Sequence, residues 1–120
     1  MSTIIASNIS DGTTSVASTY VVNGSAKVWS VVHQIGTLAL LDSFNIGSII
    51  DNSVGDTSYN FSISFSSSNY SAGYSTSNGN NFVGEQTGRT ASSIRLLSNQ
   101  HDGTAEDVNH QNLQIHGDLA

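Results

Sequence analysis

The sequence predicts an all-β fold, an antiparallel β-sandwich with an extended N-terminal arm. Two observations indicate it. Apolar and polar residues alternate strictly through residues 57–65, and short apolar runs recur at roughly 10-residue spacing between polar turns. No segment has a convincing helical period, and the chain contains no proline, so Gly, Asn and Asp are expected to make the turns. A jelly roll and a small barrel are alternatives compatible with the same pattern.

Residues 1–23 are expected to form the arm. They are small and polar, with one short apolar patch at Ile4 and Ile5. We expect this arm to dock on a neighbouring protein or to join copies of the chain. The sandwich domain is expected to occupy residues 24–120 and to begin near Asn23-Gly24, a dipeptide that suits a tight turn.

Residues 25–33 are expected to be the first strand of the domain. Val28 and Val32 would lie on one face, and Trp29 and Val31 on the other. Because both faces carry apolar residues, this strand should be central or covered by another subunit. Residues 37–41 form a further short apolar run that is expected to be a strand, with a helix as the alternative.

Residues 44–65 give the strongest pattern, a hairpin whose turn is residues 51–56. Its inward face would carry the large apolar residues of both strands, with Ser and Asn on the other face. So many large side chains are not left in water on a soluble monomer. We therefore expect the core or a subunit seam to contain Trp29, Phe44, Ile46, Tyr59, Phe61, Ile63 and Phe65, with Ile50 on the face of Phe44 and Ile46.

The remaining strands are expected around residues 70–76, 91–98 and 107–118. Tyr70 and Tyr74 would share one face of a Ser, Asn and Gly-rich segment. This combination of Tyr with Ser, Asn and Gly is typical of adaptable recognition surfaces and could line a glycan groove. The alternative is a pair of core tyrosines whose hydroxyls lie at the rim.

The charge balance argues against two classes of partner. The net charge is −6, and the only cations are Lys27, Arg89 and Arg95. A protein that grips nucleic acid needs a cluster of basic residues, so neither nucleic acid nor an anionic membrane surface is expected as a partner. No apolar run is long enough to insert in a membrane, and no signal peptide is recognisable, so we expect a product made in a cytoplasm.

No catalytic residue, metal site or cofactor is expected. His110 and His116 would share a strand face, but about 20 Å apart. The acidic residues fall mainly in turns and lack the alternating pattern of a calcium loop. No Gly-x-Ser-x-Gly motif is present, and without cysteine there is no thiol chemistry.

Three segments carry a resemblance to a known family: "SAKVW" (25–29), "DSFNIGSIIDNSVGDTSYNFSISF" (42–65) and "NYSAGYS" (69–75). They resemble a small β-domain that recurs in tail-fibre and other structural proteins of marine bacteriophage virions. The segment "SVVHQIGTLALL" (30–41) departs from that pattern, which is more polar after the tryptophan. The resemblance implies a non-enzymatic virion component that forms homo-oligomers, with a trimer favoured. It supplies no ligand-binding residues.

These observations lead to an expected function. The chain would be a tail-fibre or receptor-binding module on the virion surface, in contact with other virion proteins and with a host cell-surface glycan or receptor. The alternative is a capsid decoration protein or head fibre. A glycan-degrading tip is less favoured, because its chemistry needs clustered carboxylates in a groove.

Overall fold

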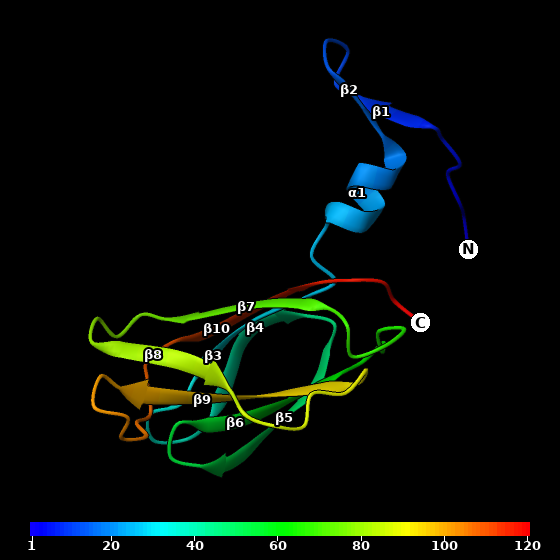
Figure 1. The fold of residues 1–120 in the computed structure, drawn as a ribbon. Coiled ribbons are helices and arrows are strands. Elements are labelled where there is room, and N and C mark those ends of the chain that lie inside the picture. The colour runs from blue at the N-terminus through cyan, green and yellow to red at the C-terminus, as the bar shows by residue number, and fades with distance from the viewer.

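The computed structural model describes residues 1–120 and shows two four-stranded antiparallel sheets packed face to face (Figure 1). The first, the β3 sheet, has the order β4 (Ala39–Phe44), β3 (Val28–His33), β10 (Gln111–His116) and β7 (Ser71–Thr76). The second, the β6 sheet, has the order β5 (Ile46–Ser53), β6 (Asp56–Phe61), β9 (Ser93–Gln100) and β8 (Asn81–Glu85). The predicted antiparallel sandwich is confirmed, and the two separate sheets do not form a closed barrel.

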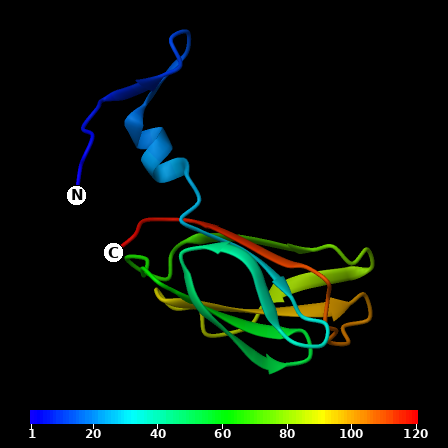
Figure 2. The same ribbon diagram turned by 180° about the vertical axis from the view of Figure 1, so that it is seen from behind.

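The chain crosses between the sheets at both of their edges. It passes from β4 to β5 at one edge and from β7 to β8 at the other, and β10 returns to lie between β7 and β3. Strands β7 to β10 therefore follow a Greek-key path. The arm and the C-terminus lie at the same end of the sandwich, as both views show (Figures 1 and 2).

The arm is folded rather than extended, which corrects one detail of the prediction. It contains a hairpin of β1 (Asn8–Ser10) and β2 (Ser15–Ala17), followed by the helix α1 (Ser18–Gly24). The hairpin turn is held by Asp11, whose Oδ1 accepts hydrogen bonds from the backbone N–H groups of Thr13 and Thr14. Helix α1 buries none of its residues and is neither long nor apolar enough to cross a membrane.

The core lies between the two sheets and is built mainly from the inward positions of their central strands. An aromatic cluster fills the end near the arm: the ring centroid of Phe61 lies 5.4 Å from that of Phe65 and 5.9 Å from that of Tyr70. The buried apolar residues are Val28, Val32, Tyr59, Phe61, Phe65, Tyr70, Ile94, Leu96, Leu113 and Ile115. Tyr59, Phe61 and Phe65 are thus core residues, as predicted, and Ile46 is half-buried against them.

Four residues that were expected on the apolar faces of the core or of a subunit seam lie outside the core. Phe44, Ile50 and Ile63 are largely exposed, and Trp29 is 38% exposed on the outer face of the β3 sheet. The single continuous strand expected over residues 57–65 in fact ends at Phe61.

Asn45 explains the exposure of Ile63 and Phe44. Its backbone has a φ of 59°, which turns the chain from β4 into β5 after one residue. The Asn45 side chain accepts a hydrogen bond from the Ile63 N–H (2.7 Å) and donates one to the Ile63 carbonyl (3.0 Å). This bonding ends β6 and leaves the Ile63 side chain in solvent, and it separates Phe44 from the face that Ile46 occupies.

A β-bulge explains the position of Ile50. The pairing of β5 with β6 shifts between Ile46 and Ser48, so Gly47 is an extra residue. One extra residue reverses the faces that follow it. Ile49 therefore packs against the core, and Ile50 points outward.

Buried polar side chains tie the sheets together at the end opposite the arm. The Tyr59 hydroxyl donates to Gln111 Oε1 (2.5 Å), and Gln111 Nε2 donates to Ser98 Oγ (2.7 Å). Gln34 Nε2 donates to Thr57 Oγ1 (2.9 Å) in the same region. These bonds fix the loops at this end, because a buried amide left without partners would be destabilising.

Candidate binding surfaces

The outer face of the β3 sheet carries an aromatic and amide-rich surface. Every second residue of each strand points outward, and the strand pairing arranges these residues in two rows. One row is Phe44, Trp29, Gln114 and Gly73, and the next is Asp42, Val31, Asn112 and Ser75. We call these eight residues the Trp29 face.

The β4 and β3 side of the Trp29 face is apolar. Trp29 and Phe44 are directly paired across the two strands, where Cβ atoms lie about 5 Å apart. Phe44 is 55% exposed, and the indole N–H of Trp29 donates to no acceptor in the chain. The pairing thus places two large aromatic side chains, one of them with an unpaired donor, on neighbouring strands of this outer face.

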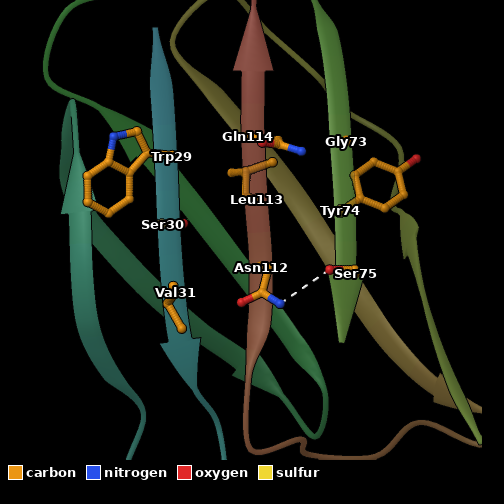
Figure 3. A pocket seen from close by; sticks show the side chains of 9 residues that line it. All are labelled: Trp29, Ser30, Val31, Gly73, Tyr74, Ser75, Asn112, Leu113 and Gln114. Carbon is orange, nitrogen blue, oxygen red and sulfur yellow. Dashed lines mark hydrogen bonds between the residues drawn. The ribbon is translucent and has the colours of Figure 1, made fainter. Parts of the chain in front are cut away.

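The β10 and β7 side of the same face is polar. Asn112 Nδ2 donates to Ser75 Oγ (3.2 Å), whereas the exposed Gln114 amide has no hydrogen-bond partner in the chain. Beside Gln114 on β7 is Gly73, which contributes no side chain. The result is a shallow depression of about 420 Å³ over β3, β10 and β7 (Figure 3).

The eight residues of the Trp29 face carry little charge; Lys27 lies two residues before Trp29, and its Nζ donates to the carbonyl oxygens of Val22 and Ser25 in the arm and its junction with the sandwich. Asp42 is the one charged side chain among the eight residues, and none is a lysine or arginine. Arg95 pairs with Asp56 on the other sheet, and Arg89 pairs with Glu85. The Trp29 face is therefore weakly acidic to neutral.

The outer face of the β6 sheet, in contrast, satisfies its own polar groups. Asn60 Nδ2 donates to Ser48 Oγ (3.0 Å), and Asn52 Nδ2 donates to Ser58 Oγ (2.8 Å). These cross-strand bonds use the small polar residues that the sequence placed opposite the apolar ones. This face has fewer free donors and acceptors for a ligand.

Tyr70 and Tyr74 were expected to share one face, either as a recognition surface or as core tyrosines with their hydroxyls at the rim, and Tyr70 is a core tyrosine. Its ring is buried in the aromatic cluster, and its hydroxyl lies 3.1 Å from the carbonyl oxygens of Thr90 and Ser93. The Arg89 guanidinium lies 4.6 Å from the ring centroid. Burial raises the pKa of Tyr70 to about 12, against the opposing effect of the Arg89 charge. Tyr74 is half-buried against the core and borders the depression.

The residues that form the Trp29 face were only partly found from the sequence. The sequence predicts that Trp29 and Phe44 lie in the core or a subunit seam, and it predicts no binding role for Asn112 or Gln114. One signal does point to this face: in residues 111–116, Leu113 and Ile115 alternate with polar residues. That alternation marks an outward amide row.

The arm exposes a second apolar surface. Ile4 and Ile5 are more than nine-tenths exposed, as expected for residues that would dock elsewhere. The hairpin and α1 add five further exposed apolar residues: Ile9, Val16, Tyr20, Val21 and Val22. The arm was expected to be polar apart from Ile4 and Ile5, and it exposes further apolar side chains along its hairpin and helix.

The histidine and acidic side chains do not gather into a site. His110 Nδ1 lies 3.0 Å from Ser77 Oγ, and His33 Nδ1 lies 3.0 Å from the Asn109 carbonyl oxygen. No group of three or more His, Cys, Asp or Glu side chains is placed to hold a metal ion.

Comparison of the chain with protein-family models, curated proteins and solved structures finds no match. Its function is therefore inferred from its own fold and surfaces.

Proposed function

We propose that the chain is a non-enzymatic surface protein of a bacteriophage virion that acts as a tail-fibre or receptor-binding module. The observation that carries this proposal is the arm. It projects from one end of the sandwich and exposes eight large apolar residues, Met1 among them (Figures 1 and 2). A protein that is attached to a larger assembly needs an apolar segment for attachment, here the arm, and a separate folded domain, here the sandwich.

The arm is proposed to attach the chain by burying these apolar side chains. Burial is favourable by about 25 cal/mol for each Å² of apolar surface removed from water. Within one chain little of this surface is covered, since α1 has no buried residue. Copies of the chain, or another virion protein, would supply the missing contacts, and a homotrimer is the favoured assembly.

The sandwich is proposed to face outward as the binding head. The Trp29 face offers aromatic rings and free amide groups, which are the groups that recognition surfaces use. A glycan-degrading tip finds less support, because the Trp29 face has a single carboxylate, Asp42, where hydrolysis of a glycosidic bond usually requires two.

Light scattering on the purified chain tests the role of the arm. We expect the mass of a trimer for the native chain and of a monomer for the variant Tyr20→Asp/Val22→Asp, because charges at these positions oppose burial. Thr13→Asp is the control variant, because it adds a charge in the hairpin turn of the arm without removing an apolar side chain. A native chain that is monomeric at micromolar concentration would contradict self-association through the arm.

Immunogold labelling of intact virions tests the location. Label at the tail tip or fibres is the expected result. Label on the capsid would instead support a decoration protein or head fibre, and unlabelled virions would overturn both assignments.

A further inference from the structure

We infer that the Trp29 face is a binding site for a neutral oligosaccharide. This inference deepens the proposed function, on which it rests for the biological source of the ligand, by naming the chemical class of the receptor. Three features of the eight residues favour such a ligand: the paired aromatic side chains, the unpaired polar groups, and the absence of lysine and arginine.

The aromatic pair suits the apolar face of a sugar ring. One side of many pyranose rings presents only C–H bonds, which pack against an aromatic ring, while the hydroxyl groups point sideways from the contact. Trp29 and Phe44 are paired on adjacent strands, and both are exposed. Aromatic rings on two adjacent strands can contact successive sugar units of a chain. The indole N–H, which has no partner in the protein, can donate to a sugar hydroxyl.

The polar side of the face suits the sugar hydroxyls. A hydroxyl donates one hydrogen bond and accepts others, and an amide offers both a donor and an acceptor. Gln114 has both groups free, and Asn112 keeps its carbonyl oxygen free while its Nδ2 bonds Ser75. Gly73 lies beside Gln114 in mid-strand, where the Gln114 side chain leans over it, and the glycine adds no side chain of its own to the depression (Figure 3).

The charge of the face selects neutral ligands. Anionic glycans are normally held by lysine or arginine, and the Trp29 face contains neither. Asp42 lies in the same surface, and the chain has a net charge of −6, so a sialylated or uronic-acid-containing chain would be repelled. Asp42 can instead accept hydrogen bonds from the hydroxyls of a neutral sugar.

A second copy of the chain is a poorer occupant of this face. A stable protein interface buries about 800 Å² on each partner and leaves few polar groups unpaired. A symmetric contact here would remove both Gln114 and the charged Asp42 from water. A hydroxyl-rich ligand supplies partners for these groups, whereas a second apolar surface does not.

Ligand binding at this face can be followed by tryptophan emission, because Trp29 is the only tryptophan in the chain. The experiment titrates the native full chain with maltohexaose, cellohexaose, chitohexaose and mannohexaose at up to millimolar concentrations and follows tryptophan emission. We expect a saturable change with at least one of these neutral sugars. Polysialic acid serves as the anionic comparison and should give none.

Gly73→Val tests whether the depression is the site. A Cβ at Gly73 would lie 3.6 Å from Gln114 Cγ, an ordinary contact, and its backbone is not in the left-handed region, so the strand should tolerate valine. The added side chain fills the depression and should weaken sugar binding at least about tenfold. The control is Gly84→Val on the outer face of β8, where a Cβ meets nothing within 4 Å. Gln114→Ala, an exposed truncation that should leave folding intact, should also weaken binding.

Several results would overturn the inference. They are the absence of a saturable response to all four neutral sugars, an equal response in Gly73→Val and the native chain, or stronger binding of polysialic acid. A fall in oligomer mass in Gly73→Val but not in Gly84→Val would assign the face to a contact between copies. The titration uses purified protein, so its failure would leave the virion location to be decided separately by immunogold labelling.

Discussion

Arg95 and Asp56 join two adjacent strands of the β6 sheet by a two-point ion pair. Arg95 Nε lies 2.7 Å from Asp56 Oδ1, and Nη2 lies 2.6 Å from Oδ2. The Asp56 side chain is almost fully buried, whereas that of Arg95 is 45% exposed. The hydrogen bonds from Arg95, aided by one from Asn52 and opposed by burial, hold the pKa of the Asp56 carboxyl below its usual range.

This ion pair predicts a specific loss of stability in acid. Because the folded-state pKa of Asp56 is lowered, its contribution is complete above the unfolded-state pKa of about 3.9 and is lost as the pH falls through the folded value. In Asp56→Asn this contribution is absent. We expect the melting temperatures of the native chain and the variant to differ by a constant amount above about pH 5 and to converge below about pH 4.

Asp51→Asn is the control for this experiment, because it removes the same charge from the adjacent strand β5 without breaking an ion pair. A gap between the native chain and Asp56→Asn that does not change with pH would contradict the prediction.

Gly55 occupies a turn where no other residue fits. Its φ is 70°, and a Cβ there would lie 2.5 Å from the Ser98 carbonyl oxygen and 2.7 Å from that of Glu106. Gly55→Ala should therefore lower the free energy of unfolding by more than about 2 kcal/mol. Gly36→Ala has a similar φ of 76° but open space around it, and should lose only about 1 kcal/mol. Urea unfolding measures both, and equal losses would show that the backbone contacts around Gly55 are unimportant.

Phe65 and Ile63 should respond very differently to truncation. Both were expected on one apolar face, yet Phe65 is 2% exposed in the aromatic cluster and Ile63 is 57% exposed. Phe65→Ala should lose about 3–5 kcal/mol of stability, and Ile63→Ala about 0.5 kcal/mol or less. Chemical denaturation measures the loss of stability in both variants. A large loss for Ile63→Ala would contradict the exposed position of Ile63 and would indicate that it is buried in a seam between subunits.

Two buried hydroxyls offer a comparison of paired and unpaired polar groups. The Tyr59 hydroxyl donates to Gln111 Oε1, while Ser30 Oγ is buried without any hydrogen-bond partner. Tyr59→Phe should lower stability by about 1–3 kcal/mol, because it leaves Gln111 Oε1 without its donor. Ser30→Ala should be neutral or stabilising, because it removes an unsatisfied group. The thermal unfolding of the two variants checks the signs, and destabilisation by Ser30→Ala would imply a partner for that hydroxyl.

The sequence predicts the sandwich well where each residue obeys one simple rule. The alternation of Tyr59 and Phe61 with small polar residues places β6 correctly, and Val28 and Trp29 lie on opposite faces of β3, as their alternation predicts. In both cases the assignment of residues to opposite faces depends only on the strand period.

The errors arise where one residue changes the phase of that period. The side chain of Asn45 bonds to a residue 18 positions along the chain, and the bulge at Gly47 depends on the strand paired with it. Neither event is visible in a local pattern. The helix of the arm was missed because α1 is too short to show a helical period.

The candidate site was harder to predict than the fold. Trp29, Phe44 and Gln114 meet only because β3 pairs with β4 on one side and β10 on the other. This juxtaposition comes from the sheet topology, in which β10, the last strand of the chain, lies between β7 and β3, the first strand of the domain.

The shared position of the arm and the C-terminus, at one end of the sandwich, leaves the four loops of the opposite end unattached (Figure 1). A peptide inserted at Gly36 or Gly103, two turn positions with open space around them, would be carried away from the anchor. The domain is in this respect a natural scaffold for peptide display. The buried glutamines hold the loop end of the sandwich, opposite the arm, rigid. Fusions and tethers can be placed at the end that carries the arm and the C-terminus.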